Sequence, residues 1–202
     1  MCGNAGDGSP GSKSIITVMT ADTTLRSKMT KSELRKKIKD IPLDAVYKIT
    51  ASEIIRKKVL SSEMFEKADT IFSYVSTDRE PDTREIIKKA LSLGKKVCVP
   101  KCRQKPNMDL IYIASLDCLS EARLGLMEPA SGEKALTEDI DLAIIPCVSV
   151  TEDGIRLGHG GGYYDKFMEN FTGTNMCLCF KKLMREDLPK EQHDINVNVV
   201  SD

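Results

Sequence analysis

The stretch "DLAIIPCVSV", residues 141–150, is the strongest strand signal in the chain. It is an almost continuous apolar run, whereas a strand with one face in water would alternate apolar and polar residues. Strands of this kind are typical of a sheet that is covered on both faces. The segment therefore favours an α/β protein with a mostly parallel sheet.

Segments with the character of strands and helices alternate around residues 141–150. Short runs rich in β-formers predict strands over 69–76, 95–100, 109–114, 175–180 and 197–200. Buried strands separated by amphipathic helices form sheets with helices on both faces. We therefore expect a single three-layer α/β domain with a mostly parallel central sheet, Rossmann-like in architecture.

Two of the expected helices carry recognisable start signals. Thr30 and Glu33 have the spacing of a capping box, which predicts a helix that begins directly after Thr30. Asp82, with Glu85 three residues later, predicts a second capped helix over 82–94. The second helix lies between the predicted strands 69–76 and 95–100, as the alternating pattern requires.

Two further helices are expected over 43–60 and 163–171. The first has apolar residues at helical spacing, which predicts one buried face. That predicted face consists of Val46, Tyr47, Ala51, Ile54, Ile55 and Val59.

Residues 1–28 differ in composition from the rest of the chain. They are rich in Gly, Ser, Thr, Asp and Asn and lack sustained periodicity. This composition predicts a disordered leader, or residues added for expression. The folded domain is expected over 29–202, and a chain of 202 residues suits one domain.

Charge and cysteine content narrow the class of partner. The 30 basic and 30 acidic residues cancel, and aromatic residues make up only 5%. These values favour neither nucleic acid nor a membrane surface as a partner. The seven cysteines lack the paired CxxC motifs of structural zinc sites, so we expect free thiols in a reducing cytoplasm. These observations favour a cytoplasmic protein.

The stretch "IRLGHGGGYYDK", residues 155–166, has the chemistry of a phosphate site. Its glycines permit positive φ and let backbone N–H groups approach an anion. Arg156 offers a planar fork to phosphate oxygens. Asp165, in the first turn of the expected helix, is placed to hold Mg²⁺ beside the phosphates. The glycines are Gly158, Gly160, Gly161 and Gly162.

Neither standard nucleotide motif describes this loop. The GxGxxG pattern, counted from Gly158, needs a glycine where Tyr163 stands, and the Walker pattern needs a closing GK[ST]. The simpler alternative is a mobile surface loop in which Asp165 only complements the helix dipole. Composition favours phosphate binding, and the alternative stays open at this point.

The segment "RLGHGGGYYD", residues 156–165, resembles the RLGxGxGYYD signature of the 5-formyltetrahydrofolate cyclo-ligase family, the methenyltetrahydrofolate synthetases. The strand 141–150 and its continuation resemble that family's D-L-x-x-x-P segment. Other segments resemble the family in the same order, so that the resemblance covers roughly residues 30–200. They are "KSELR" (31–35), "YVSTDREPDT" (74–83), "GLMEP" (125–129) and "LPKEQHD" (188–194).

The resemblance implies roles for individual residues outside the loop. Lys31 and Arg35 would contact ATP phosphates, and Asp165 and Asp194 would bind magnesium. Glu80 would bind the folate, because a reduced pterin offers neighbouring N–H donors to a carboxylate's two oxygens. Val75 would line the folate pocket.

Within the loop, the resemblance implies a continuous ATP-binding segment, with Tyr163 also facing the folate. We expect no covalent nucleophile, and we assign no catalytic role to either His159 or His193. The ATP-binding segment comprises Arg156, Leu157, Gly158, His159, Gly160, Gly161, Gly162, Tyr163 and Tyr164.

The activity implied is ATP- and Mg²⁺-dependent cyclisation of 5-formyltetrahydrofolate to 5,10-methenyltetrahydrofolate, with release of ADP and phosphate. The chain departs from the family at a few positions: Asn198 replaces a common aspartate, Leu183 a glutamine, and Val150 and Thr151 an F-D pair. Two alternatives remain: a catalytically weak paralogue that binds folate or nucleotide, and a related ATP-dependent enzyme with another formyl or acyl substrate.

Overall fold

The computed structural model describes Met1 and residues 29–191 and 194–202. The predicted leader, apart from Met1, and His193 lie outside the described residues. The predicted domain boundary between residues 28 and 29 therefore stays a prediction.

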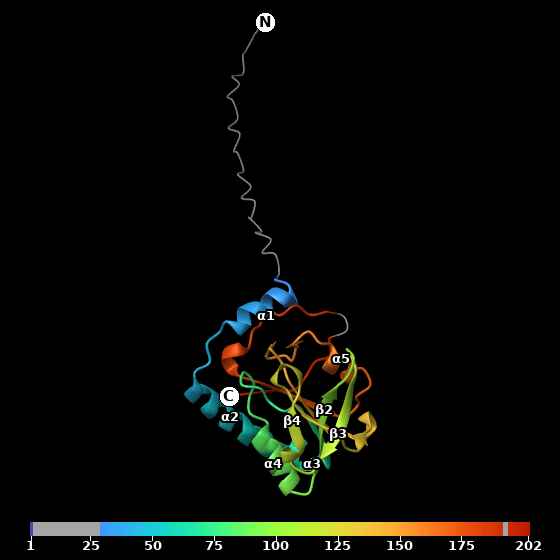
Figure 1. Cartoon of the computed structure of the whole chain (residues 1–202). Helices are drawn as coiled ribbons and strands as arrows, with labels where there is room; N and C mark the ends of the chain where they lie inside the picture. Colours follow the sequence, from blue (N-terminus) through green and yellow to red (C-terminus); the bar gives the residue numbers. More distant parts are fainter. Residues whose placement is uncertain (2–28, 192–193) are drawn as a thin grey trace.

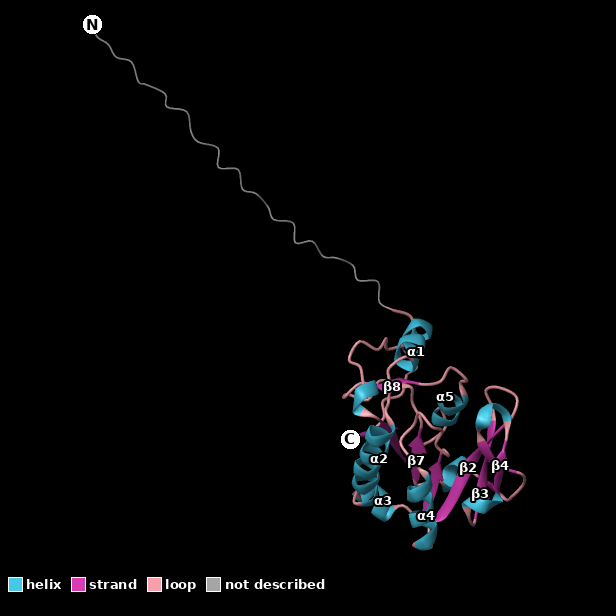
Figure 2. Ribbon diagram, turned by 60° about the vertical axis from the view of Figure 1, so that its left-hand side comes forward, coloured by secondary structure: helices cyan, strands magenta, loops and turns pink. Residues whose placement is uncertain are grey.

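The central sheet has seven strands in the order β11-β10-β7-β1-β2-β3-β6. Figure 2 shows the strands in magenta, with helices packed around them. The first five are parallel, whereas β3 and β6 are antiparallel to their neighbours. This confirms the α/β architecture with a mostly parallel sheet. The strands are β1 (Thr70–Ser73), β2 (Lys96–Cys102), β3 (Met108–Ile113), β6 (Lys134–Ala135), β7 (Leu142–Ile145), β10 (Thr174–Cys179) and β11 (Val199–Ser201).

Helices cover both faces of this sheet (Figure 1). Helix α4 joins β1 to β2, and α5 joins β7 to β10, in the opposite direction along the sheet. Because parallel crossovers are right-handed, the two helices lie on opposite faces. Phe72 of β1 packs on Phe167 of α5, with ring centroids 4.9 Å apart. The helices are α1 (Lys31–Lys39), α2 (Ala45–Leu60), α3 (Glu63–Lys67), α4 (Arg84–Ser92) and α5 (Tyr163–Met168).

The predicted strand 141–150 is in fact two strands. β7 ends at Ile145, and Ser149–Val150 forms β8, which pairs with β9 (Arg156–Leu157) in a separate small sheet. Pro146 follows β7 directly and has no N–H to donate to a sheet ladder. The apolar run extends across Pro146 because β7 and β8 are both buried, which is why the sequence predicted a single strand.

The predicted caps had different outcomes. The capping box between Thr30 and Glu33 is present at the start of α1. Asp82 is not the N-cap of α4, because Thr83 occupies that position without a side-chain cap bond. The Thr83 hydroxyl instead donates to the Tyr74 carbonyl at 2.7 Å. Asp82 accepts from the Arg84 N–H at 2.9 Å, so it still caps the first turn locally.

The buried face of α2 is narrower than predicted. Ala51, Ile55 and Val59 are buried at a spacing of four, whereas Val46 is 71% and Ile54 44% exposed. A single row at this spacing suffices because α2 meets the rest of the molecule along one line, through α4 and β11. Helix α5 is also shorter than the predicted 163–171, since it ends at Met168.

The smaller elements were not predicted from the sequence. β4 (Leu119–Glu121) pairs with β5 (Met127–Pro129), which is formed by the last three residues of "GLMEP". Of the helices in the described part of the chain, none has the length and apolar character needed to cross a membrane.

Candidate active site

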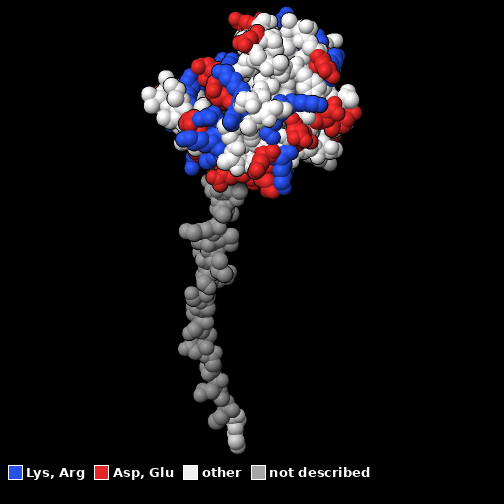
Figure 3. Space-filling model, turned by 90° about the horizontal axis from the view of Figure 1, so that it is seen from below, with Lys and Arg blue, Asp and Glu red and all other residues white. Residues whose placement is uncertain are grey.

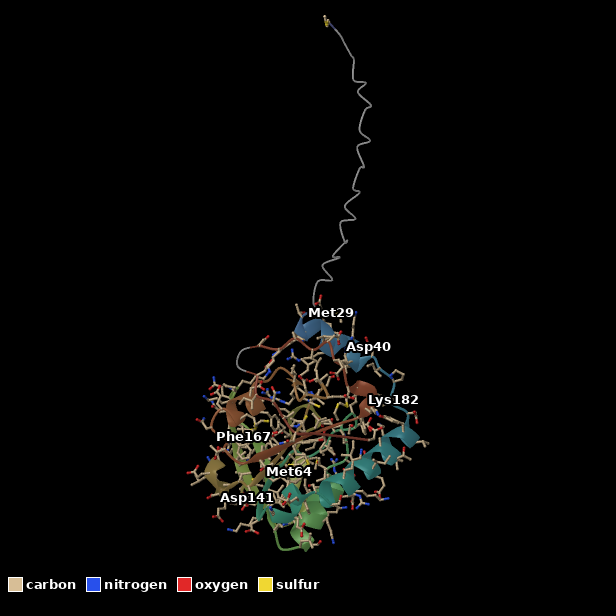
Figure 4. The ribbon with its side chains drawn as sticks, turned by 180° about the vertical axis from the view of Figure 1, so that it is seen from behind. Met29, Asp40, Met64, Asp141, Phe167 and Lys182 are labelled. Carbon is tan, nitrogen blue, oxygen red and sulfur yellow. The ribbon has the colours of Figure 1, made fainter. Side chains whose placement is uncertain are left out.

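The two loops that carry the predicted site leave neighbouring strands at the centre of the sheet. β1 leads into residues 74–83, which include Glu80, and β7 leads into residues 146–162. The chain turns in opposite directions after these strands, so a crevice forms at their carboxyl ends, where open α/β sheets bind ligands. In Figure 4, Asp141, just before β7, lies at the lower edge, and Met29, just before α1, lies at the upper edge. Helix α1 therefore lies at the carboxyl end of the sheet.

Helix α1 positions both predicted phosphate cations, Arg35 on the glycine loop and Lys31 on the segment that carries Asp194. Arg35 donates through Nε to the Gly158 carbonyl at 2.7 Å, across 123 positions of sequence. Lys31 Nζ lies 2.9 Å from Asp194 Oδ1 and 3.0 Å from Glu191 Oε2. Burial alone would lower the pKa of Lys31, but the hydrogen bonds that Lys31 donates to these two carboxylates outweigh it and raise the pKa. Lys31 therefore carries its charge at neutral pH.

The glycine loop contains the positive φ angles that its composition suggests. Gly160 and Gly162 have φ values of 85° and 76°, which disfavour a side chain. The Arg35 guanidinium packs on Gly160, where an added Cβ would lie 3.3 Å from Cζ. Gly162 occupies the N-cap position of α5, a helix of only 6 residues. The loop is therefore shaped by glycine and held by a side chain from α1.

Arg156 and Asp165 form an ion pair beside the loop. Arg156 also donates to the Pro146 carbonyl at 3.0 Å, and its side chain is only 8% exposed. The Asp165 side chain is 62% exposed. The cation is thus fixed by the protein, whereas the carboxylate can reach a ligand.

The predicted metal ligands lie around one small cavity. Asp165, Asp194 and Arg156 line a cavity of about 20 Å³, together with Met168, Ile195 and Val197. Carboxylate oxygens are the donors that Mg²⁺ prefers, and this ion is commonly held by one or two carboxylates plus water and phosphates. No group of three or more acidic, His or Cys side chains that could hold a metal occurs within the described ranges. The pair of aspartates fits a nucleotide-bound Mg²⁺ in its donor type.

Glu80 is a buried carboxylate with preformed hydrogen bonds. Its side chain is 8% exposed. Oε2 accepts from the Thr77 N–H at 2.8 Å and the Thr77 hydroxyl at 2.7 Å. Oε1 lies 3.1 Å from His159 Nε2. Burial would raise the pKa of Glu80, but hydrogen bonds from His159 and Thr77 outweigh it and the pKa is lowered.

A cleft of about 1000 Å³ opens beside Glu80. One wall is α2, which contributes Lys48, Ile49 and Ser52, and the other is the loop between β1 and α4. This volume is at the upper end of the range of small-molecule sites. A ligand in the cleft can therefore reach the carboxylate of Glu80.

The two tyrosines of the motif have different environments. Tyr164 packs on Phe72 with ring centroids 6.0 Å apart, and burial raises the pKa of its hydroxyl. Tyr163 donates instead to the Arg103 carbonyl at 3.3 Å, in the loop between β2 and β3. Tyr164 is therefore part of the core, and Tyr163 is the tyrosine on the outer side.

Two predicted contact residues have buried side chains. Leu157 is 1% exposed in β9, so only its backbone faces the loop. Val75 is 7% exposed and is not among the residues that line the cleft. Its predicted contact with folate stays a prediction.

The residues that depart from the family pattern are either buried or take part in joining strands. Asn198 and Asn175 bond each other twice, at 3.0 and 2.8 Å, and join the last strand to β10. Leu183 is buried, and Val150 and Thr151 belong to the buried β8 region. In this structure, Asn198 therefore has a role in sheet pairing.

Sequence reasoning missed two contacts of Glu80. Thr77 lies three residues before Glu80, a spacing that allows a turn with a side-chain hydrogen bond. His159 lies in another loop, and no pattern in the chain connects it with Glu80. Only the meeting of the two loops at the switch point brings them together.

The sequence profile of the 5-formyltetrahydrofolate cyclo-ligase family matches residues 18–202. A mouse (Mus musculus) 5-formyltetrahydrofolate cyclo-ligase is 28% identical over 199 residues, which cover 92% of this chain and 95% of the mouse protein. A protein of Caenorhabditis elegans, described as a probable member, is 33% identical over 69% of this chain and 73% of its own length.

Solved structures agree with the sequence comparison. The structure of the Aquifex aeolicus 5,10-methenyltetrahydrofolate synthetase superposes with a TM-score of 0.75 at 31% identity. The alignment covers 85% of this chain and 89% of that one. Fold, motif order and sequence similarity extend over the same residues, and the chain belongs to the 5-formyltetrahydrofolate cyclo-ligase family.

Proposed function

We propose that this protein converts 5-formyltetrahydrofolate and ATP into 5,10-methenyltetrahydrofolate, ADP and phosphate. One observation carries the proposal: α1 brings Arg35 onto the glycine loop and Lys31 onto Asp194, while the same loop reaches the buried carboxylate Glu80 through His159. Basic groups and glycine amides suit a triphosphate. A buried carboxylate suits the N–H donors of a reduced pterin.

In this proposal ATP lies along the glycine loop. Lys31, Arg35 and Arg156 bind its phosphates together with backbone N–H groups of residues 156–164. Lys31 and Arg156 would exchange the carboxylates of Asp194 and Asp165 for phosphate oxygens. The freed carboxylates then face the phosphates.

Asp165 and Asp194 would hold Mg²⁺ between themselves and the phosphates. Bound there, the ion would neutralise charge on the transferring phosphoryl group. Both residues line the same small cavity beside Arg156, which supports this assignment.

Folate would bind with its pterin at Glu80 and the remainder in the adjoining cleft. The carboxylate fixes the pterin so that the formyl oxygen faces the γ-phosphate, and Tyr163 borders the same space. Because Glu80 is already buried and hydrogen-bonded, it would orient the substrate without first having to be ordered.

The reaction then needs positioning and charge neutralisation rather than a protein nucleophile. The formyl oxygen attacks the γ-phosphorus of ATP. The bond between this phosphorus and the bridging oxygen of ADP breaks, and an imidate phosphate forms. N10 next attacks the activated carbon and loses its proton. The carbon–oxygen bond breaks, phosphate leaves, and the N5–CH–N10 bridge of the methenyl product remains. Lys31, Arg35 and Arg156 stabilise the charge on the transferring phosphate.

A spectrophotometric assay tests this function. The protein is mixed with 5-formyltetrahydrofolate and MgATP, and methenyl absorbance and ADP are measured together. Equal amounts of both products are expected. ADP without methenyl product would favour another formyl or acyl substrate, tight folate binding without either product would favour a non-catalytic paralogue, and inert protein would refute the proposal.

We further propose a cytoplasmic monomer with small-molecule substrates alone. The six described cysteines are free, as is usual in a reducing compartment. Basic and acidic side chains are intermixed on the face shown in Figure 3, which disfavours a nucleic acid or membrane partner at that face. Cell fractionation and light scattering of the purified protein test these assignments.

A further inference from the structure

His159 of the glycine loop points at the folate side of the crevice. Its Nε2 lies 3.1 Å from Glu80 Oε1. The His159 side chain is 54% exposed, whereas that of Glu80 is 8% exposed. The imidazole therefore lies between solvent and a carboxylate that is otherwise enclosed.

The backbone on either side of His159 is held by one residue. Arg35 Nε donates to the Gly158 carbonyl at 2.7 Å, and the Arg35 guanidinium packs on Gly160. These contacts fix the backbone of the loop and leave the side chain of His159 as the movable part. Rotation of exposed side chains is fast and needs no rearrangement of the fold.

Among the described residues, only His159 contacts Oε1 of Glu80. Both donors of Thr77 bind Oε2, at 2.8 and 2.7 Å, from within the same turn. Oε1 is therefore the oxygen at which an incoming N–H donor would be received. A donor that approaches it meets the imidazole first, so ligand and His159 compete for the same acceptor.

We propose that His159 caps Glu80 in the folate-free enzyme and is displaced when the substrate's N–H donors bind this carboxylate. The inference rests on the proposed function of Glu80 and deepens it. His159 is then a positioning residue that links the phosphate loop to the folate site. Because the cap must be removed before folate binds, it lowers the apparent affinity of the enzyme for folate.

The direction in which removal of the His159 side chain changes folate affinity separates this role from a structural one. If His159 only orients Glu80, its removal weakens folate binding. If it caps Glu80, its removal strengthens binding, since a competing hydrogen bond to a charged acceptor is lost. Glutamine can place an N–H donor near the position of Nε2, so it should retain the cap.

Titration calorimetry with 5-formyltetrahydrofolate, in the absence of nucleotide, tests the proposal. His159→Ala and His159→Ser should lower the Kd roughly 3- to 30-fold, and His159→Gln should stay near the wild-type value. In a Glu80→Gln background, His159→Ala should give no gain. Unchanged or weaker binding by both truncated variants would overturn the cap.

Glu80→Gln alone distinguishes this failure from that of the proposed function. If Glu80→Gln weakens folate binding and the His159 truncations do not strengthen it, only the cap is refuted. If Glu80→Gln has no effect, or the wild type binds no folate, both the folate site and the cap are refuted.

Discussion

The two loops at the switch point are built in opposite ways. The loop after β1 is tied to itself: the Ser76 N–H donates to the Thr83 hydroxyl at 3.0 Å, and Thr77 donates twice to Glu80. The glycine loop is held from outside, by Arg35 of α1 and by the contact between His159 and Glu80. The Glu80 carboxylate is thus positioned by hydrogen bonds within its own turn, although Arg79 and Asp82 of the same loop also bond to the α1 and α2 segments. The glycine loop has its contacts with Arg35 and Glu80 from distant parts of the chain.

This difference matches what each loop has to bind. A flat pterin edge is recognised by two donors at fixed positions, which favours a rigid carboxylate. A triphosphate with its cation is bound by several charges that can exchange partners. The ion pairs of Lys31 with Asp194 and of Arg156 with Asp165 hold these charges until the ligand arrives.

The largest effect is expected from Asp165→Ala on the phosphate side. Loss of a metal ligand should reduce turnover ~100-fold or more at saturating magnesium. Stability should change little, because the side chain is 62% exposed. Methenyl formation and thermal unfolding measure the two effects. Glu169→Ala, an exposed change at the other end of α5, is the control, and equal activities of the two variants would exclude Asp165 as a metal ligand.

On the folate side, Glu80→Gln should raise the KM for 5-formyltetrahydrofolate roughly 10- to 100-fold, since a charge-assisted hydrogen bond is lost. Initial rates at saturating ATP measure this constant. If the KM of Glu80→Gln lies within a factor of about 2 of the wild-type value, Glu80 does not bind folate.

The same carboxylate predicts a pH dependence of stability. Its folded-state pKa lies below the ordinary value of 4.5, so the ionised group stabilises the fold above that pH. This contribution should disappear as the pH falls through the folded-state pKa. The difference in unfolding free energy between wild type and Glu80→Gln should therefore be constant from neutral pH to about pH 5 and shrink below it. Urea unfolding across this range measures it, and a difference that grows toward low pH would contradict the assignment.

The phosphate side also depends on the C-terminal segment that carries Asp194. Gly154 has φ 90°, and a Cβ added there would lie 2.4 Å from the Val197 carbonyl oxygen. Gly154→Ala should therefore cost about 1–3 kcal/mol more in unfolding free energy than Gly94→Ala. Gly94 is the matched control, because its φ is 76° and nothing lies within 4 Å of its added Cβ. Equal costs would show that the C-terminal segment tolerates displacement at Val197.

The smallest effect is expected from Lys31→Ala, which should weaken ATP binding about 10-fold through the loss of one charge-assisted contact. Lys39→Ala is the control, since this lysine is exposed at the far end of the same helix. Calorimetry with a non-hydrolysable ATP analogue measures both. Equal affinities of Lys31→Ala and Lys39→Ala for the analogue would show that Lys31 is an ordinary solvated lysine and does not bind ATP.

The sequence predicted the parts that depend on local pattern. The run 141–145 and the box at Thr30 have short-range causes, apolar periodicity and capping, and both occur as expected. The glycine loop was identified by composition and by a family resemblance, and Gly160 and Gly162 do have positive φ.

What the sequence could not provide depends on tertiary contact. Val46 and Ile54 were expected inside because they are apolar, but α2 buries only Ala51, Ile55 and Val59, and Val46 and Ile54 are exposed. The antiparallel direction of β3 and the contact between His159 and Glu80 follow from how distant segments meet. Neither leaves a pattern within a short window of sequence.

The most direct test of the division between the two loops is a crossed set of Michaelis constants. ATP and 5-formyltetrahydrofolate are each varied at a saturating level of the other, for wild type, Lys31→Ala and Glu80→Gln. Glu80→Gln should raise the folate constant at least ~10-fold, and Lys31→Ala the ATP constant about 10-fold, each with a change below ~2-fold in the other constant. A rise of both constants in both variants would contradict the division.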